Sequence, residues 1–484
     1  MNREIEIGAG IRGLVLLHAV LTAAAVAWAC TNNQAIYAAV GMITLLITIS
    51  PFLVLRRYDL FCPWTFVLLA VGILATPQAI CMTFNFPDTE SIERMMLLGQ
   101  DPEYFLYPSV VFLLGWVCLT FGYFGFPHIN GKSISIPRDF KPSSVVLVLG
   151  VSLLISLVAT GAYMKVTGAG SSNRISSKRT TIDTLDVGQS DQRQHGYLRQ
   201  FGKLSTISFV LIYSYLLTRP KKMTPLQMGI VGIAFLSACV FPFYSSSRAQ
   251  ICWVILYGLG LNYYLRPKNF RLKVAAIGGL GLVVVILMSF LRTSDNDEAL
   301  EKVSVVASFE KIILNRNGPG LSKTAHIINH VPEPLDFQYG KTFGVWFLAP
   351  IPRELYPNKP LIHTGPIIGT TIYSTRVSGV PPGFIGELYW NFHIPGVIFG
   401  MFLFGFSMNR LYLLFRNCQL SPGIVVPVYL FAITPIMLKA LCNSLGVGVV
   451  MQAVDLFMIV AVVFCCTQPV IFPKPSSELK TLPA

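Results

Sequence analysis

The stretch VVLVLGVSLLISLVATGAYM, residues 145–164, contains no Asp, Glu, Lys or Arg. A helix of about 20 residues crosses the roughly 30 Å apolar core of a bilayer, so this stretch predicts a membrane-spanning helix. Similar runs recur along the chain, in which 53% of the residues are hydrophobic and only 12% are charged. Soluble domains contain about 25% charged residues. The sequence therefore predicts a single integral membrane unit over residues 1–484.

Apolar runs of suitable length predict an all-α polytopic membrane protein with about twelve transmembrane helices. The predicted spans are 13–30, 35–55, 65–84, 107–126, 145–164, 204–218, 226–244, 249–265, 274–291, 393–409, 423–440 and 446–467. Pro427 and Pro435 fall inside one of these runs. Prolines free backbone carbonyls of a membrane helix, so neighbouring groups are expected to bond them there.

Lysine and arginine are concentrated in the short loops on one side of the predicted spans. These cations are Arg56, Arg57, Lys132, Arg138, Lys141, Arg219, Lys221, Lys222, Arg266, Lys268, Arg271, Lys273, Arg410 and Arg416. Short cytoplasmic loops are enriched in such residues, so we expect this side and both termini to face the cytoplasm. About half of the 37 cations fall on the opposite side, beyond what insertion requires. An anionic ligand outside the cytoplasm explains that excess.

Three segments on the predicted outer side are long: 85–106, 165–203 and 292–392. The segment 165–203 is polar and basic, and 292–392 forms a large extracytoplasmic loop between the ninth and tenth predicted spans. Within the large loop, EALEKVSVVASFEKIIL and GLSKTAHIINHV have helical spacing and predict amphipathic helices at the membrane surface. His326 and His330 are then expected on a polar face, since no third metal ligand is evident.

Arginines at or beyond the outer ends of the spans form the main candidate binding site, together with a lysine in the proline-rich segment PRELYPNKP, 352–360. They are Arg248, Arg292, Arg316, Arg353, Arg376 and Lys359. Guanidinium groups bind phosphate oxygens in a bidentate way. Ser247 is expected to cap a helix that begins at Arg248, which adds free amide donors for an anion. Lipid headgroups at a helix end are the alternative partner of Arg248.

The stretch PPGFIGELYWNF brings Glu387, Tyr389 and Asn391 to the outer start of the tenth span. A carboxylate among aromatic residues suits a base or a sugar-hydroxyl anchor, and equally a counter-ion of one of the arginines. His363, which follows the proline-rich segment, is a second candidate for proton transfer.

Four strings in order, SSSRAQ, FQYGKTF, APIPRELYPNKP and GFIGELYWNFHIPGVIFG, resemble the bacterial O-antigen and oligosaccharide repeat-unit polymerases (Wzy-type) over roughly residues 240–405. The resemblance implies a GT-C-like, metal-independent, inverting glycosyltransferase of the bacterial inner membrane, with its active site facing the periplasm. It would join polyprenyl-diphosphate-linked repeat units without a cofactor. Arg248 and Arg353 would bind the diphosphate, with Arg316 and Lys359 in support, and Tyr339, Tyr389 and Asn391 would contact sugar.

The expected partners are polyprenyl-diphosphate-linked glycans, membrane lipids and a polysaccharide chain-length regulator, with no nucleic acid. An O-antigen ligase that transfers glycan to lipid A core needs the same donor site. A lipid-linked oligosaccharide transporter is the other alternative; the absence of visible repeats and the scarcity of charged residues within the spans weigh against it.

Overall fold

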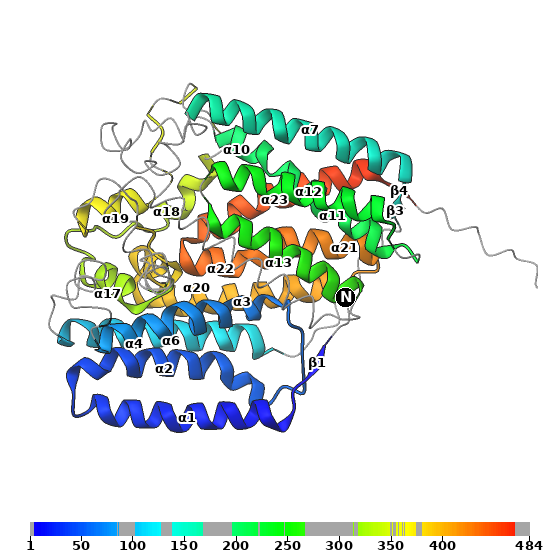
Figure 1. Cartoon of the computed structure of the whole chain (residues 1–484). Helices are drawn as coiled ribbons and strands as arrows, with labels where there is room; N and C mark the ends of the chain where they lie inside the picture. Colours follow the sequence, from blue (N-terminus) through cyan, green and yellow to red (C-terminus); the bar gives the residue numbers. More distant parts are fainter. Residues whose placement is uncertain are drawn as a thin grey trace, which may run out of the picture.

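A computed structural model describes most of the chain. The described residues are 4–84, 86, 102–126, 138–167, 196–220, 223–245, 247–266, 313, 318–348, 351, 355–356, 358–360, 362, 364–373 and 380–469. The long helices lie side by side in one bundle, and the short helices α17 (Leu321–Asn329), α18 (Lys341–Gly344) and α19 (Gly365–Thr371) gather at one end of it (Figure 1).

Runs of apolar residues form the long helices. These are α1 (Ala9–Ala29), α2 (Ile36–Ile49), α3 (Pro63–Leu69) continued by η3 (Ala70–Ala75) and α4 (Thr76–Phe84), α6 (Leu106–Phe124), α7 (Pro142–Thr167), α10 (Gly196–Gly202) followed by α11 (Leu204–Thr218), α12 (Pro225–Tyr244), α13 (Arg248–Leu265), α20 (Phe384–Arg416), α21 (Pro422–Val428) continued by η7 (Tyr429–Ile433) and α22 (Thr434–Cys442), and η8 (Gly446–Val450) continued by α23 (Met451–Cys466). Four of them begin at a proline, a favourable first position because that residue needs no N–H partner.

Ten helices within the described residues are long and apolar enough to cross a membrane, and each coincides with a predicted span. The prediction of an all-α polytopic membrane protein is therefore confirmed. The predicted span 249–265 forms the helix α13, which is not among these ten and contains the polar residues Gln250 and Asn262. The predicted span 274–291 lies outside the described residues.

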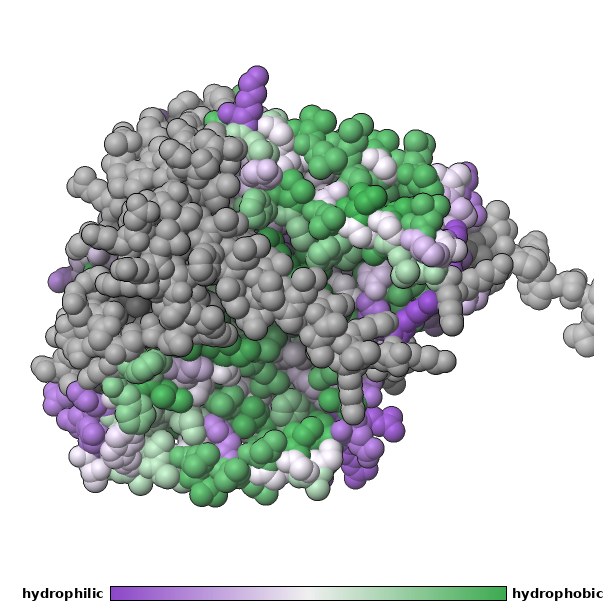
Figure 2. Space-filling view, in the orientation of Figure 1, coloured by the Kyte–Doolittle hydropathy of each residue, from purple (hydrophilic) through white to green (hydrophobic). Residues whose placement is uncertain are grey.

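The outer surface of the bundle is apolar where a bilayer would surround it. Large hydrophobic side chains on its outer helices are exposed, among them Leu14 (65%), Val146 (75%) and Phe457 (74%). Figure 2 shows an apolar surface along the length of the bundle, with hydrophilic residues gathered toward its two ends. This pattern suits a protein whose solvent is lipid along its length and water at its ends.

Two short antiparallel sheets lie at the end opposite α17, α18 and α19 (Figure 1). One pairs β1 (Ile5–Glu6) with β2 (Arg57–Tyr58), and the other pairs β3 (Arg138–Phe140) with β4 (Thr467–Pro469). Contacts between other basic segments join the same end: Arg266 Nη2 donates to the Arg219 carbonyl, and Arg416 pairs with Glu4 at 2.7 Å. The described basic loops and the N-terminal segment thus share one end of the bundle, as predicted.

The helices α6 and α20 pack against each other and approach closely at two glycines. A methyl group added at Gly122 would lie 2.2 Å from the Phe402 carbonyl oxygen, and one added at Gly405 would lie 2.3 Å from that of Leu119. Small residues let membrane helices pack backbone to backbone, where dispersion contacts replace the hydrophobic driving force. This pair holds α20, which carries Glu387, in a fixed position.

The predicted need for neighbours around Pro435 is met by one side chain. Pro435 lacks the N–H that would bond the Phe431 carbonyl. Gln452 Nε2 donates to the carbonyl oxygens of Phe431, at 3.3 Å, and Ala432, at 3.1 Å. The amide of Gln452 therefore compensates for the proline and ties α23 to η7.

Candidate functional site

The helix α20 is interrupted near its start, at the end of the bundle where α17, α18 and α19 lie (Figure 1). Phe392 (φ −140°, ψ 17°) and His393 (φ 57°, ψ −151°) are non-helical, and Pro395 follows them. The predicted tenth span began at 393, but the structure extends the helix back to Phe384. Sequence reasoning missed the helical segment 384–391. The positive φ of His393 and the proline at 395 separate this short segment from the long apolar run, and the apolar run alone predicted a span that begins at 393.

Glu387 lies on this short segment and is completely buried. Its Oε2 accepts a hydrogen bond from the backbone N–H of Leu445 at 2.7 Å. Leu445 is the residue before η8, so the carboxylate occupies the positive end of that helix. The other oxygen, Oε1, is buried and makes no hydrogen bond of standard geometry in the described part of the chain, and the side chain of Thr342 lies close enough to interact with the carboxylate. The Leu445 amide and the Thr342 side chain thus position Glu387.

Asn391 connects the same segment to the chain around residue 340. Its Oδ1 accepts from the Gly340 N–H at 2.8 Å, and its Nδ2 donates to Thr342 Oγ1 and to the Glu387 carbonyl oxygen, both at 2.7 Å. Both amide hydrogens are therefore used within the protein. Asn391 fixes the segment that carries Tyr339. The predicted contact of Asn391 with sugar stays a prediction.

The other predicted polar residues of the described site differ in exposure. Tyr389 is buried, with its hydroxyl 3.2 Å from that of Tyr107. Tyr339 is 75% exposed, which suits a residue that contacts a large glycan. Lys359 is buried, and its Nζ donates to the Ile351 carbonyl at 2.7 Å. Glu387, Tyr389 and Asn391 therefore come together on one segment, as predicted.

The predicted guanidinium cluster falls mostly outside the described residues. Arg292, Arg316, Arg353, Arg376 and His363 all lie there. The helix α13 begins at Arg248 as predicted, and the side chain of Arg248 is likewise outside the description. Ser247 occupies the capping position but makes no side-chain capping hydrogen bond. The diphosphate-binding role of these residues stays a prediction.

The helix predicted at GLSKTAHIINHV is present as α17, but the prediction that it lies on the membrane surface is wrong. Eight of its nine residues are buried. Lys323 Nζ donates to the Cys442 carbonyl at 2.7 Å, and Tyr104 OH lies 3.0 Å from His326 Nδ1. These partners let a polar helical face lie inside the protein, so hydrophobic periodicity alone misplaced it.

Lys323 and Glu387 hold the same turn, residues 443–445, from two sides. Lys323 bonds the last carbonyl of α22, and Glu387 bonds the amide just before η8. A cation at a helix C-terminus and an anion at an N-terminus are both favoured by the helix dipole. Burial lowers the pKa of Lys323 to about 8. The turn is thereby fixed against the segment that carries Glu387.

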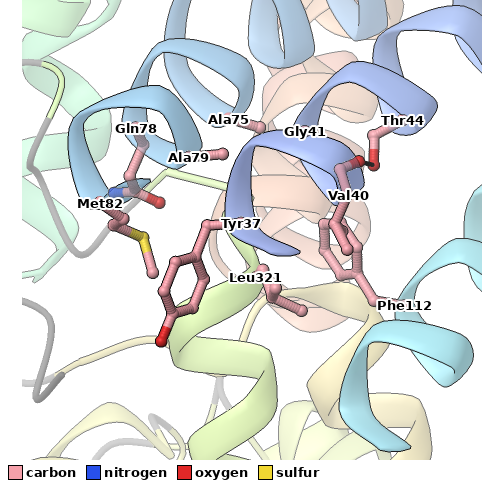
Figure 3. Close-up of a pocket in the computed structure, with 10 residues that line it drawn as sticks. All are labelled: Tyr37, Val40, Gly41, Thr44, Ala75, Gln78, Ala79, Met82, Phe112 and Leu321. Atoms are coloured by element: carbon pink, nitrogen blue, oxygen red, sulfur yellow. Dashed lines mark hydrogen bonds between the residues drawn. The ribbon is translucent and has the colours of Figure 1, made fainter. Parts of the chain in front are cut away.

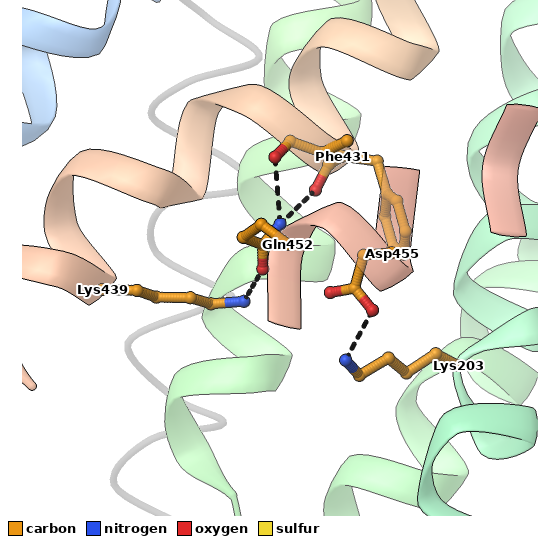
Figure 4. Close-up of polar contacts among 6 residues, drawn as sticks. Lys203, Phe431, Lys439, Gln452 and Asp455 are labelled. Carbon is orange, nitrogen blue, oxygen red and sulfur yellow. Dashed lines mark hydrogen bonds and ion pairs between the residues drawn. The ribbon is translucent and has the colours of Figure 1, made fainter. Parts of the chain in front are cut away.

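A second polar group lies within the membrane-spanning helices (Figure 4). Lys203 Nζ pairs with Asp455 Oδ1 at 2.7 Å, and Lys439 Nζ donates to Gln452 Oε1. The sequence contains a signal for this group. Lys439 and Asp455 are the only Asp, Glu, Lys or Arg residues inside the twelve predicted spans.

A small cavity lies between α2, the η3–α4 segment, α6 and Leu321 of α17 (Figure 3). Its volume is about 10 Å³, and residues such as Tyr37, Gln78 and Phe112 line it. A cavity of that size holds at most one water molecule. It is too small for a sugar, so it is not a substrate site in this conformation.

No protein-family model, no curated protein and no solved structure matches the chain. The described site joins a buried carboxylate held by the Leu445 amide, a break in the helix that carries it, and a neighbouring exposed aromatic residue, Tyr339.

Proposed function

We propose that the protein is a membrane glycosyltransferase that joins polyprenyl-diphosphate-linked oligosaccharide repeat units into O-antigen or a related surface polysaccharide. Glu387 is the observation that carries the proposal. It is buried, its Oε2 is held by the Leu445 amide, and its Oε1 makes no hydrogen bond of standard geometry among the described residues, with the Thr342 side chain beside the carboxylate. A carboxylate fixed in this way is suited to accept the proton of an attacking sugar hydroxyl.

The chemistry needs few other groups from the protein. The glycan of one lipid-linked unit is transferred to the non-reducing end of another: a sugar hydroxyl oxygen bonds to the anomeric carbon, and the bond from that carbon to the diphosphate oxygen breaks. The hydroxyl proton passes to Glu387, and the diphosphate leaves with its negative charge. Positioned cations stabilise that charge, the role we assign to Arg248, Arg353, Arg316, Arg292, Arg376 and Lys359.

The arrangement of the two ends supports a site that faces away from the cytoplasm. The described basic loops share the end with β1–β4 (Figure 1), and the segment of α20 that carries Glu387 lies at the other end, where Gly386 packs against Ile327 of α17 and Asn391 accepts from Gly340 before α18. Under the positive-inside rule the basic end is cytoplasmic. We therefore place the protein in the bacterial inner membrane with both termini in the cytoplasm and Glu387 toward the periplasm.

A direct test uses a lipid-linked repeat unit as the sole substrate for the purified protein. A polymerase makes a ladder of products from that unit alone. A ligase makes none until lipid A core is added, so this result would replace our proposal with the ligase. In cells, deleting the chain should leave surface glycan of a single repeat, and unchanged glycan length would contradict the proposal.

A transporter of lipid-linked oligosaccharide is the second candidate, and one observation favours it. Charged residues inside spans are common on substrate and ion pathways, and Lys439 and Asp455 lie close together there. Reconstituted protein that moves the lipid-linked unit across a liposome membrane, without releasing polyprenyl diphosphate, would establish transport and exclude polymerisation.

A further inference from the structure

Three charged residues meet within the helices of the bundle. Lys203 lies at the junction of α10 and α11, Lys439 on α22 and Asp455 on α23. Asp455 is 2% exposed and pairs with Lys203 at 2.7 Å, while Lys439 interacts electrostatically with both. Among the described residues, two cations and one anion leave this group with one excess positive charge. Uncompensated charge is costly in a membrane interior, which favours a further anion there.

Lys439 Nζ has one hydrogen-bond acceptor among the described residues, the Oε1 atom of Gln452. Gln452 Nε2 donates to the two carbonyl oxygens near Pro435, so its Oε1 is turned toward Lys439 (Figure 4). An ammonium has three donors. No second acceptor for Lys439 Nζ occurs among the described residues. The sequence of the predicted span 274–291 contains no acidic residue.

The charged group is reachable and lies close to the candidate site. The side chain of Lys203 is 20% exposed. On the far side of α23 from Asp455, Phe457 is 74% exposed, so only one helix separates the group from lipid. Lys439 lies one helical turn before Asn443, whose carbonyl accepts from the Gly383 N–H at the start of α20. The same turn, 443–445, therefore borders both this group and Glu387.

We propose that Lys203 and Lys439, with Asp455 between them, form a binding site for a phosphoryl anion within the bundle. Ammonium groups bind phosphoryl oxygens through short charge-assisted hydrogen bonds. The anion supplies the negative charge and the second acceptor for Lys439 that the described residues do not provide. A phosphate headgroup on a lipid and a free phosphate share this chemistry. The site does not depend on the proposed glycosyl transfer.

The test measures binding to the full-length protein in dodecyl maltoside, a detergent without phosphate. Equilibrium dialysis compares radiolabelled farnesyl diphosphate with inorganic pyrophosphate. Tighter binding of the farnesyl compound assigns the site to a lipid-borne headgroup, and equal binding assigns it to the phosphoryl group alone. The two substitutions Lys439→Gln and Lys203→Gln should each weaken binding at least about tenfold, because each removes a charge-assisted hydrogen bond.

The substitution Asp455→Asn separates a binding site from a structural ion pair. Asparagine keeps the shape of the side chain but removes the competing negative charge, so we expect tighter anion binding. The control Lys165→Gln changes an exposed lysine at the end of α7 and should leave affinity unchanged. Unaltered binding in both lysine variants, or weaker binding in Asp455→Asn, would overturn the inference. If the lysine variants do not fold, the Asp455→Asn comparison alone decides.

The dialysis result is independent of polymer formation. Protein that binds the anion but makes no glycan ladder keeps this site and loses the proposed function. Protein that makes the ladder but binds the probe equally well in every variant keeps the function and loses this site.

Discussion

Replacing Glu387 with Gln separates its proposed chemical role from its structural one. Glutamine has the same shape, so its carbonyl oxygen can still accept the Leu445 N–H now bonded at 2.7 Å. Its NH2 group then takes the place of Oε1, which makes no hydrogen bond of standard geometry in the described structure. A buried amide without partners costs about 1–3 kcal/mol. Removing a buried carboxylate charge offsets part of that cost. We therefore expect a folded protein with a small change in unfolding temperature.

The effect on the reaction should be much larger, because an amide cannot accept the sugar proton. Loss of a general base typically lowers a rate by about 10²–10⁴-fold, equivalent to about 3–5 kcal/mol. The assay follows the initial rate of glycan elongation from one lipid-linked repeat unit, with unfolding followed by intrinsic fluorescence. Glu387→Ala is the comparison: it also leaves the Leu445 N–H unpaired and should lower stability by about 1–3 kcal/mol. A Gln variant that elongates at the wild-type rate would refute the role of Glu387.

Three further changes test the packing around the site. Burial lowers the pKa of Lys323 from 10.5 to about 8 in the folded protein. Between pH 8 and pH 10.5 the unfolded state therefore binds more protons than the folded state, so the free energy of unfolding rises with pH in that window. Lys323→Met should abolish this rise, worth up to about 3 kcal/mol, in unfolding temperatures measured at pH 7 and pH 10. Gln452→Leu should destabilise by roughly 2–5 kcal/mol in denaturant unfolding, since two buried carbonyls lose their donor. Gly122→Ala should reduce the yield of folded protein in gel filtration, since its methyl would lie 2.2 Å from the Phe402 oxygen.

Each of these predictions has an outcome that contradicts it. A pH dependence that survives in the Lys323 variant would place the titrating group elsewhere. Wild-type stability in the Gln452 variant would mean that other donors reach the carbonyls near Pro435. For Gly122, the matched control is Gly150→Ala, which has open space around its added methyl, and equal loss in both variants would exclude close helix packing as the cause.

Apolar runs predicted the bundle well because lipid imposes a length and a composition on every spanning helix. The same reasoning foresaw that Pro435 needs a partner but could not name Gln452, which is 17 residues further along the chain. Amphipathic spacing in residues 321–329 predicted a helix and placed it wrongly. Burial of Lys323 and His326 depends on Cys442 and Tyr104, which are distant in sequence.

The sequence predicted which residues form the candidate site better than it predicted their contacts. The sequence placed Glu387, Tyr389 and Asn391 together at the start of a span, and the structure puts them on one buried helical segment. It could not show that the Leu445 amide holds the carboxylate, because that contact depends on how two distant helices pack. The sequence shows that Lys439 and Asp455 are charged residues within predicted spans. Only the structure shows that they lie close together.

The most direct measurement counts polyprenyl diphosphate released per glycosidic bond formed by the purified protein. A single lipid-linked repeat unit is the only substrate, and the Glu387→Gln variant is run beside the wild type. Our account predicts one diphosphate released for each bond, a ladder of glycans, and loss of both in the variant. Wild-type protein that forms no bond and releases no diphosphate would contradict it.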